Sequence, residues 1–389
     1  MLFMKVYMQD NLRIGIVCYP TYGGSGVIAT ELGIALANLG HQVHFISYDK
    51  PFRLDLLSAK IFYHEVTIPD YPLFEYTPYE LNLTSKLVDV AINEKLDLLH
   101  VHYAIPHASA AVNAKKILET YGIDVPIVTT LHGTDITLLG KDKSFKPVIE
   151  YAINMSDVVT AVSESLRSET LEHFNVKNHI VTIPNFIDLS LYDIKTNNLY
   201  KSNYAHKDDV IITHVSNFRK VKRVYDVIEI FEKVSKVISA KLLMVGDGPE
   251  RLAAEQLCRA KGLTNKVKFL GKLRDVERVL IISDVFVLPS STESFGLVAL
   301  EAMACATPVI STNSGGISEV NIDGKTGFLS DVGDVSKMAN DTVKLLEDKN
   351  LLDKFKHNAL VHSKSYSLHN ILPQYNRIYK ELCQLKKNK

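Results

Sequence analysis

The chain has no net charge, few cysteines and no long apolar segment. Its 44 basic and 44 acidic residues give a formal net charge of +0, so no overall field favours nucleic acid or an anionic membrane. No apolar run approaches the roughly 18 residues of a membrane span, and the N-terminal segment lacks the apolar region of a signal peptide. We therefore expect a cytoplasmic protein without a nucleic-acid or membrane partner, whose ligands are held by a local site.

The four cysteines show no pairing pattern. They are scattered along the chain, with no C-x-x-C pair and no spacing typical of metal ligands. Three of them lie in apolar surroundings, which predicts reduced thiols in the core. The four cysteines are Cys18, Cys258, Cys305 and Cys383.

Three nucleotide-binding motifs are absent. The chain has no G-x-x-x-x-G-K-[ST] P-loop and no G-x-G-x-x-G fingerprint, which argues against an ATPase and an ordinary dehydrogenase. It also has no D-x-D pair, with which many nucleotide-sugar enzymes chelate Mg²⁺ or Mn²⁺. We therefore expect neither a metal nor a cofactor, and a bound diphosphate would need basic side chains and helix N-termini instead.

Short apolar runs alternate with amphipathic segments along most of the chain. Uniformly apolar strands between helices predict α/β domains with parallel sheets covered on both faces. Strands are expected at 12–19, 42–47, 97–103, 126–132, 157–163 and 179–185, and again at 210–216, 240–246, 266–271, 284–290 and 307–312. The pattern predicts two doubly wound, Rossmann-like domains facing a cleft, with ligands outside the carboxyl ends of the strands.

The domain boundaries follow from a lapse in this alternation. Residues 1–185 form the expected N-terminal domain, and the polar segment 186–209 reads as a linker. Residues 210–364 form the second domain. The tail from Val335 to Leu385 is helical in pattern, and 365–389 are expected to end it as a separate C-terminal helix.

Two glycine-containing turns follow predicted strands and open predicted helices. The first is GGSG at 23–26 and the second is VGDGPE at 245–250. Glycine lets the backbone approach an anion, and a helix N-terminus offers N–H groups to it. A plain tight turn explains the first stretch about as well. A helix start with Asp247 as cap and Pro249 in the first turn explains the second nearly as well.

Basic and histidine-containing segments also follow strand ends. NFRKVKR at 217–223 holds four basic residues at a strand end, where they could neutralise a diphosphate. His132 ends a strand before a glycine, where side chains enter the cleft. His100 and His102 alternate on one strand and could reach one ion, but structural histidines are the better interpretation because no acidic or cysteine partner lies nearby in the sequence.

The segment STESFGLVALEA at 291–302 places two carboxylates around a short apolar stretch. Glu293 lies in the turn after a strand and Glu301 lies one to two turns into the next helix. Amides near 295–297 could bind phosphate oxygens. The two carboxylates would then suit sugar hydroxyls, which donate to an ionised carboxylate. Surface glutamates that favour a helix N-terminus are the alternative, and they account for Glu293 better than for Glu301.

These residues resemble a known family. The stretch ESFGLVALE resembles the E-x7-E motif of retaining glycosyltransferases of family 4, which have the two-domain GT-B fold, and the similarity extends over 289–329. Together with CYPTYGGSG, HVHYAIPH, TTLHGTD and SNFRKVKR, it resembles family members that transfer GlcNAc from UDP-GlcNAc to the hydroxyl of L-malate in the first step of bacillithiol biosynthesis. The resemblance implies a C-terminal helix that packs back on the first domain, and transfer without a metal, from the donor's own face.

The resemblance also implies roles for individual residues. Implied catalytic residues are His132, Arg219, Lys222 and Glu293; implied donor-binding residues are Gly24, Asn217, Gly246, Asp247, Ser294, Phe295, Gly296, Leu297 and Glu301; implied acceptor-binding residues are Ser25, Tyr103 and Thr134. Two positions depart from the family pattern. Asn217 replaces a usual arginine, for which Arg219 is assumed to substitute. Glu150 stands where a basic residue is expected, and Lys143 or Lys146 could serve instead.

Other readings stay open at this point. The chain could be a family 4 enzyme with another acceptor, a non-hydrolysing UDP-GlcNAc epimerase, or a nucleotide-sugar binder without activity. The presence of Glu293, Glu301, Lys222 and His132 argues against the last. The oligomeric state is open, and a homodimer is among the states that the sequence allows.

Overall fold

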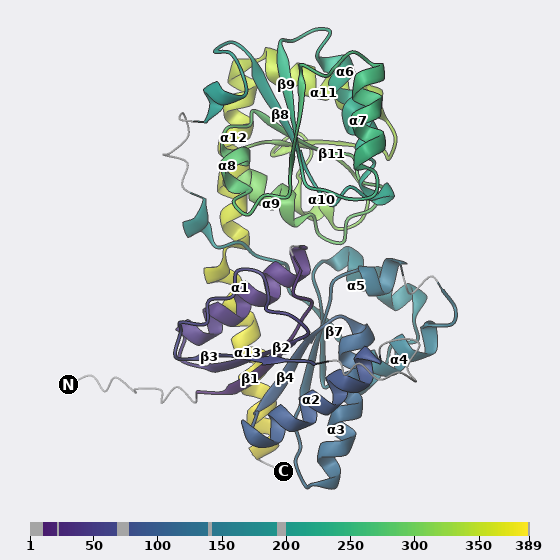
Figure 1. Cartoon of the computed structure of the whole chain (residues 1–389), viewed down its shortest axis with the longest axis vertical. Helices are drawn as coiled ribbons and strands as arrows, with labels where there is room; N and C mark the ends of the chain where they lie inside the picture. The colour runs from purple at the N-terminus through teal and green to yellow at the C-terminus, as the bar shows by residue number, and fades with distance from the viewer. Residues whose placement is uncertain (1–10, 22, 68–77, 139–141, 193–199, 388–389) are drawn as a thin grey trace, which may run out of the picture. The chain divides into compact units, whose positions relative to one another are not determined.

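Each half of the chain folds around its own parallel sheet. The computed structural model describes residues 11–21, 23–67, 78–138, 142–192 and 200–387. The chain divides into two compact units, one made of the residues up to Ile183 with those from Leu372 onward, and the other of Pro184–Ile371. Both sheets are parallel with helices on their two faces (Figure 1), so the prediction of two doubly wound α/β domains is confirmed.

The first unit has a seven-stranded sheet in the order β3-β2-β1-β4-β5-β6-β7. Its strands are β1 Arg13–Val17, β2 Gln42–Ser47, β3 Ile61–Glu65, β4 Leu98–His102, β5 Ile127–Leu131, β6 Val158–Ala161 and β7 Ile180–Thr182. Its helices are α1 Gly24–Asn38, α2 Tyr79–Asn93, α3 Ser109–Thr120, α4 Lys146–Met155 and α5 Glu164–His173, with single turns η1 Ala104–Ala108 and η2 Thr134–Leu138. The strand order reverses direction between β1 and β4.

The second unit repeats the plan with six strands in the order β10-β9-β8-β11-β12-β13. The strands are β8 Val210–Val215, β9 Ala240–Val245, β10 Val267–Gly271, β11 Val285–Leu288, β12 Val309–Thr312 and β13 Gly327–Ser330. The helices are α6 Val224–Val234, α7 Arg251–Ala260, α8 Glu277–Ile281, α9 Leu297–Ala304, α10 Ile317–Val320, α11 Val335–Glu347 and α12 Lys349–Ser363, with short turns η4 Leu189–Leu191, η6 Lys201–Asn203, η7 Lys220–Lys222 and η8 Lys364–Tyr366. Here the order reverses between β8 and β11.

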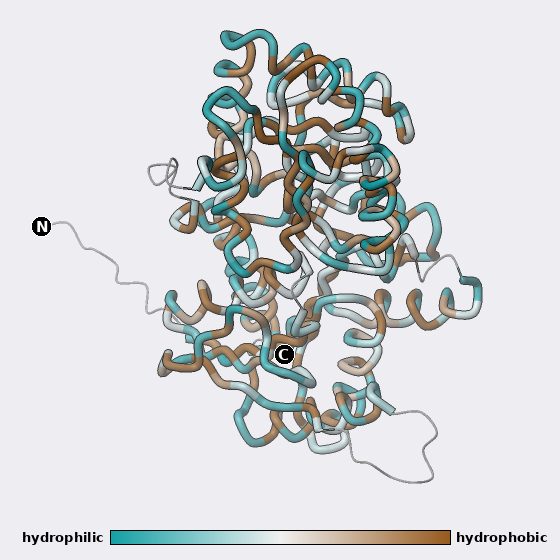
Figure 2. Tube along the Cα trace, turned by 45° about the horizontal axis from the view of Figure 1, so that its top comes forward, coloured by the Kyte–Doolittle hydropathy of each residue, from teal (hydrophilic) through white to brown (hydrophobic). Residues whose placement is uncertain are grey.

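The central strands of both sheets are buried along their whole length. Every residue of β4, β5, β11 and β12 is buried, as expected for strands covered by helices on both faces. Brown, hydrophobic segments alternate with teal, hydrophilic ones along the tube in Figure 2. All four cysteines are buried and free, in agreement with the core thiols expected from the sequence.

The last helix, α13 Leu368–Lys387, completes the first unit. Tyr375 and Tyr379 are buried at 1% and 0% exposure. The Tyr379 hydroxyl lies 2.7 Å from Nδ1 of His100 on β4. Helix α13 therefore packs against the sheet of the first unit (Figure 1). The first unit is therefore closed by a segment that is distant in sequence.

Several elements went unnamed in the sequence interpretation. The strands β3 and β13 and the helices α2 and α5 were not among the expected elements. The described residues of the segment that the sequence interpretation read as a linker, 186–192 and 200–209, fall within the range of the second unit. Ile187 is 2% exposed, and its backbone bonds to Tyr366 and Leu368.

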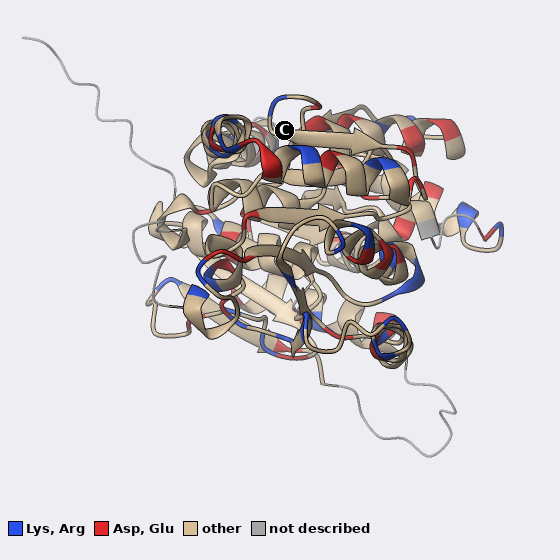
Figure 3. Ribbon diagram, turned by 90° about the horizontal axis from the view of Figure 1, so that it is seen from above, with Lys and Arg blue, Asp and Glu red and all other residues tan. Residues whose placement is uncertain are grey.

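Charged side chains are distributed over the helices and loops. Blue and red segments alternate along the ribbon in Figure 3, in keeping with the formal net charge of +0. Among the described residues, no helix combines the length and apolar character needed to cross a membrane.

Candidate active site

Backbone hydrogen bonds join the loops that follow four strands of the second unit. The amide of Phe218 donates to the carbonyl of Asp247 (2.9 Å), and that of Ser291 donates to the carbonyl of Val221 (2.8 Å). The amide of Gly316 donates to the carbonyl of Glu293 (2.7 Å). These loops follow β8, β9, β11 and β12, so they surround the point where the strand order reverses. Ligands of open α/β sheets bind at such a point.

Lys222 and Glu293 meet at this switch point. Nζ of Lys222 lies 2.5 Å from Oε1 of Glu293, and the Ser290 hydroxyl donates to the same oxygen at 2.7 Å. Their side chains are 20% and 11% exposed. Two residues predicted from the sequence are thus in direct contact, and Ser290 is a further partner that the sequence interpretation missed.

His214 lies beneath this pair. Its Nδ1 bonds to the carbonyl of Val287 at 2.9 Å and its Nε2 lies 2.7 Å from the Ser216 hydroxyl. Burial, with a smaller contribution from the charge of Lys222, lowers the pKa of His214 to about 4, against the opposing effects of the Val287 carbonyl and of Glu293. The imidazole is therefore neutral at physiological pH and serves as a fixed hydrogen-bonding support.

The basic segment 217–223 separates into residues with different partners. Arg223 pairs with Asp226 (2.7 Å) and adopts a left-handed backbone, with φ 48°. Arg219 is exposed at the start of η7, and Asn217 is exposed as well. Arg219 is therefore the more exposed of the two arginines of this segment, and Arg223 is held by Asp226.

The turn VGDGPE packs against the neighbouring turn after β8. Gly246 has a φ of 118°, and a Cβ there would lie 1.8 Å from the carbonyl oxygen of Ser216. Only glycine fits such an approach. The Asp247 side chain accepts from the Gly248 amide at 2.9 Å, whereas α7 begins at Arg251 with Glu250 at its N-cap and no side-chain cap. The alternative in which Asp247 caps the helix is therefore wrong.

Helix α9 begins between the two carboxylates of the segment STESFGLVALEA, Glu293 and Glu301. Gly296 is the N-cap residue with φ 90°, and Leu297 begins the helix, so Ser294 lies in the preceding turn. Phe295 is buried at 3% exposure and packs against Tyr366 with ring centroids 5.7 Å apart. The first amides of a helix lack intrahelical partners, and they are suited to an anion here.

Glu301 lies one turn further along α9. It is half-buried, and Oε1 accepts a hydrogen bond from the Tyr192 hydroxyl at 3.2 Å. Tyr192 comes from the segment that the sequence interpretation assigned to the linker. This partner could not be predicted from the sequence, because the two residues are far apart in the chain.

In the first unit, the three residues implied to bind the acceptor lie together. The Tyr103 hydroxyl donates to the Ser25 hydroxyl oxygen at 2.7 Å, and the Thr134 side chain also hydrogen-bonds to Tyr103. Ser25 and Tyr103 follow β1 and β4, the two strands at which the order of this sheet reverses. Since Ser25 accepts from Tyr103, its own proton is available to an acceptor oxygen. Gly24 is exposed at the first position of α1, one residue before Ser25.

His132 belongs to a row of buried imidazoles. Its Nε2 lies 2.8 Å from Nδ1 of His102, and Nδ1 of His107 lies 2.5 Å from the carbonyl of His102. Burial lowers the pKa of His132 to about 3 and that of His107 to about 4. Neutral rings of this kind hydrogen-bond in one tautomer each, so His102 holds the orientation of His132.

Asp135 is a buried carboxylate that the sequence interpretation missed. Its Oδ2 accepts from the Ala104 amide at 2.7 Å and its Oδ1 from the Gly133 amide at 3.2 Å. Burial raises its pKa to about 6, although backbone hydrogen bonds lower it. Asp135 thereby fastens the turn after β5 to the turn after β4, and the acidic residue in TTLHGTD was the available sequence signal.

His100 and Glu150 have structural partners. His100 lies 2.7 Å from both the Thr130 hydroxyl and the Tyr379 hydroxyl, as the structural interpretation expected. Glu150 accepts from the Asn175 amide at 2.7 Å and lies 3.8 Å from Lys146. Lys143 is exposed.

Comparisons with known proteins agree with this arrangement. The family model described as Glycosyltransferase Family 4 matches residues 22–191, and that described as Glycosyl transferases group 1 matches 196–361. The chain belongs to the glycosyltransferases of family 4. It is 47% identical to the N-acetyl-alpha-D-glucosaminyl L-malate synthase of Bacillus anthracis over 97% of this chain and 99% of that protein. It is also 26% identical to the uncharacterized glycosyltransferase MJ1178 of Methanocaldococcus jannaschii over 98% of this chain and 99% of that protein.

Solved structures share the fold at lower identity. A glycosyltransferase from Rickettsia africae ESF-5 matches with a TM-score of 0.80 and 22% identity, over 96% of this chain and 99% of that one. The HepE protein of Anabaena, solved in complex with UDP and glucose, matches with a TM-score of 0.80 and 20% identity, over 95% of this chain and 100% of that one. These likenesses establish the two-domain glycosyltransferase fold.

Proposed function

We propose that the protein transfers GlcNAc from UDP-GlcNAc to the hydroxyl of L-malate with retention of configuration and without a metal, as the first step of bacillithiol biosynthesis. The observation that carries this proposal is the 47% identity, over nearly the whole of both chains, to a protein named N-acetyl-alpha-D-glucosaminyl L-malate synthase. The cytoplasmic location expected from the sequence is part of the proposal, because both substrates are small metabolites of that compartment.

The donor is assigned to the second unit. Lys222 and Arg219 would meet the diphosphate, together with the first amides of α9 around Gly296 and Leu297. Glu293 would accept hydrogen bonds from the hydroxyls of the sugar, and Glu301 from those of the ribose. The contact of Lys222 with Glu293 (2.5 Å) supports this assignment, because one residue pair can then hold both the diphosphate and the sugar beside it.

The chemistry requires no carboxylate as a nucleophile. The bond between the anomeric carbon and the β-phosphate oxygen breaks, and its electron pair leaves with UDP. The malate hydroxyl oxygen forms the new bond to the same face of that carbon, and its proton passes to the departing phosphate oxygen. Lys222, Arg219 and helix amides stabilise the charge that develops on UDP, as fixed dipoles and charges do in a site from which water is excluded.

The acceptor is assigned to the first unit. Ser25, Tyr103 and Thr134 offer hydroxyls to the carboxylates of malate, and the N-terminus of α1 adds its unpaired amides. Glu150 is engaged with Asn175, so the second carboxylate would be met by Lys143 or Lys146. His132, oriented by His102, would contact the transferred sugar.

The test is release of UDP by the purified protein from UDP-GlcNAc, with EDTA present throughout. L-malate should stimulate release strongly. Succinate, which has both carboxylates and no hydroxyl, should not. The anomeric coupling constant of the product, measured by NMR, should report the α configuration. Malate-dependent release that is lost in EDTA would contradict the metal-free mechanism.

Other outcomes separate the alternatives. Conversion of UDP-GlcNAc without any acceptor would indicate an epimerase. Tight UDP binding with no release under any condition would indicate a binding protein. UDP release that responds to another hydroxy acid or sugar, and not to malate, would keep the family and overturn the assigned acceptor.

A further inference from the structure

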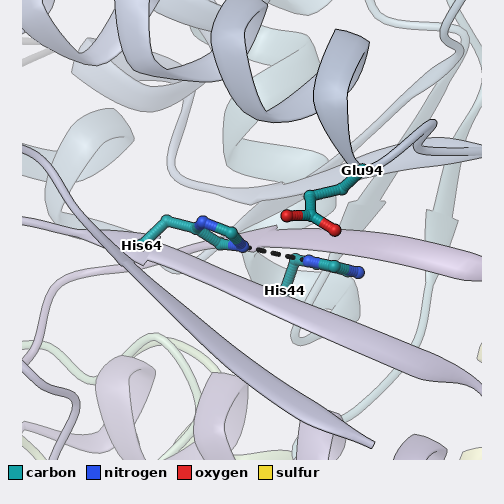
Figure 4. Close-up of side chains that lie close together, drawn as sticks. All are labelled: His44, His64 and Glu94. Carbon is teal, nitrogen blue, oxygen red and sulfur yellow. Dashed lines mark hydrogen bonds between the residues drawn. The ribbon is translucent and has the colours of Figure 1, made fainter.

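Two histidines and a glutamate of the first unit lie close together, apart from the residues assigned above. His44 is on β2, His64 is on β3 and Glu94 directly follows α2. One nitrogen of each imidazole and one carboxylate oxygen all lie within 4.8 Å of one another (Figure 4). In the parallel register of β2 and β3, His44 pairs with Phe62 and Ile46 pairs with His64. The two histidines therefore project from the same face of the sheet.

The two imidazoles are in the state that binds metal ions. Burial lowers the pKa of His44 to about 4, with smaller contributions from His64 and Arg13. Burial also lowers the pKa of His64. Both rings are therefore neutral near pH 7, and each has a lone pair on one nitrogen.

The polar groups of this cluster are incompletely paired. Nδ1 of His44 and Nε2 of His64 lie 3.0 Å apart and can share one proton. His44 is 1% exposed, yet its Nε2 has no hydrogen-bond partner among the described residues. Nε2 lies on the edge of the His44 ring that faces away from His64 (Figure 4), so the atoms that face a shared ion are Nδ1 of His44 and Nε2 of His64.

The position of Glu94 gives an independent indication. Glu94 is the C-cap residue of α2, whose last turn contains no basic residue. A carboxylate at a helix C-terminus is opposed by the helix dipole, whereas a cation there is favoured. A cation held by Glu94 would offset this unfavourable placement.

We propose that His44, His64 and Glu94 bind a divalent transition-metal ion of the Zn²⁺ type. Imidazole nitrogens and a carboxylate oxygen suit this class of ion, with bonds of about 2.0–2.2 Å. Ligand atoms of a tetrahedral ion lie about 3.3 Å apart for such bonds. To bind such an ion, Nδ1 of His44 and Nε2 of His64, which lie 3.0 Å apart, need to move slightly apart. The Glu94 carboxylate needs to move closer to them. His64 and Glu94 are half-buried, which leaves a fourth position open to solvent.

The ion would have a structural role. β3 is the edge strand of its sheet and is partly exposed, so a bound ion would tie it to β2 and to the end of α2. Nearby charges moderate the affinity. Arg13 donates to the carbonyl of Glu94 at 3.3 Å, and Lys86 lies 3.9 Å from Asp89 close to His64.

The experiment titrates Zn²⁺ into the full-length chain after EDTA treatment and removal of the chelator, in competition with a chromophoric zinc indicator. The variants are His64→Gln and Glu94→Gln. The control is His179→Gln, which changes an exposed histidine of the same unit. We expect one equivalent to bind to the wild type and to the control, and at least tenfold weaker binding to both cluster variants.

A second readout keeps the test independent of folding defects. Zn²⁺ should raise the melting temperature of the wild type and of His179→Gln, and leave that of His64→Gln and Glu94→Gln unchanged. Co²⁺ should give the visible spectrum of a tetrahedral site only in the first two. If the wild type binds Zn²⁺ no more tightly than the cluster variants, these residues form only a histidine–histidine hydrogen bond and the proposal is overturned.

Discussion

Lys222 and Glu293 reach each other from loops that follow neighbouring strands of the second unit, and each is mostly withdrawn from solvent. We predict that Lys222→Ala lowers kcat about 100- to 1,000-fold, because a fixed positive charge at the leaving group is lost in a poorly hydrated site. Steady-state UDP release from UDP-GlcNAc and malate measures this effect. The fall should be in kcat more than in KM for the donor, since charge develops on UDP mainly in the transition state.

Lys220→Ala is the matched control for this prediction. Lys220 lies two residues earlier in η7 and is exposed, so its charge is screened by solvent. Its loss should change kcat/KM at most a few-fold. Equal effects of the two substitutions would mean that the segment acts only through its overall charge, and the specific role of Lys222 would be excluded.

The hydroxyls of Ser25 and Tyr103 are coupled, so they make a second prediction at this scale. In Tyr103→Phe the Ser25 oxygen loses its donor, and the serine proton is free to point away from an acceptor carboxylate. We expect KM for malate to rise about tenfold, the equivalent of a typical net hydrogen-bond contribution. UDP affinity, measured by calorimetry, should stay the same.

Tyr121→Phe serves as the control for Tyr103, because Tyr121 ends α3 and is 66% exposed. It should leave both constants unchanged. A loss of UDP affinity in Tyr103→Phe, with KM for malate unaltered, would place this tyrosine on the donor side.

Side chains with a distinctive motif could be predicted from the sequence, and their supporting partners could not. Glu293 and Lys222 stood out because charges beside a glycine turn or a strand end have few structural uses. Ser290 and Tyr192 carry no such signal, and the only signal for Asp135 was its place in TTLHGTD. Each acts through one contact with a residue that the fold brings close, and serines, tyrosines and aspartates are common in loops for other reasons.

At the scale of elements, the turns after β8 and β9 depend on close backbone contact. We predict that Gly246→Ala destabilises the second unit by about 3 kcal/mol, because it combines a left-handed φ with a clash against a neighbouring backbone. The free energy of unfolding from urea titration should show this loss. UDP affinity should fall in parallel, since the same turn positions Asn217 and Phe218.

Gly262→Ala is the control for Gly246→Ala, because it tests the cost of a left-handed backbone conformation without a steric clash. Gly262 also has a positive φ, of 67°, but a Cβ there would meet nothing within 4 Å. Its cost should be limited to the left-handed conformation, about 1 kcal/mol. If the two substitutions cost the same, packing between the two turns contributes nothing to the stability of this site.

The elements that the sequence predicted well are those buried on both faces. β11 is a continuous apolar run, and β4, β5 and β12 combine apolar residues with buried histidine, threonine or serine, which is compatible with strands covered by helices on both faces. β3 reads IFYHE and has a half-exposed pattern, because it lies at the sheet edge, where polar residues are tolerated. β13 reads GFLS, in which a glycine and a serine flank only two apolar residues. Its pairing with β12 depends on the three-dimensional register rather than on its composition.

At the scale of the whole molecule, the two units differ in their buried histidines. Burial lowers the pKa of His44 and His107 to about 4 and of His100 and His132 to about 3, all in the first unit. The second unit has one comparable case among the described residues, His214 at about 4. An unfolded histidine titrates near pH 6.5. Between pH 6.5 and about 4 the unfolded chain therefore binds more protons than the native one, and stability is lost as the pH falls.

The size of this effect decides which unit fails first in acid. At pH 5.5 each such histidine costs up to about 1.4 kcal/mol, so the four named above cost up to about 6 kcal/mol. His102 adds to this cost, because burial lowers its pKa well below the usual value. Asp135 acts in the opposite sense, because its raised pKa of about 6 lets the native carboxyl take up a proton that the unfolded one does not, and it returns about 1 kcal/mol. The remaining loss is comparable with the total stability of many domains.

We therefore predict that the first unit loosens at pH 5.5 while the second stays folded. Hydrogen exchange, corrected for its intrinsic pH dependence, should show lost protection in β4 and β5 and retained protection in β8 and β9. The first unit carries the proposed acceptor site, so malate-dependent turnover should fall at this pH while UDP still binds. Equal loss of protection in both units would mean that they unfold as one cooperative body, in which case the histidines of the first unit would set the acid stability of the whole chain.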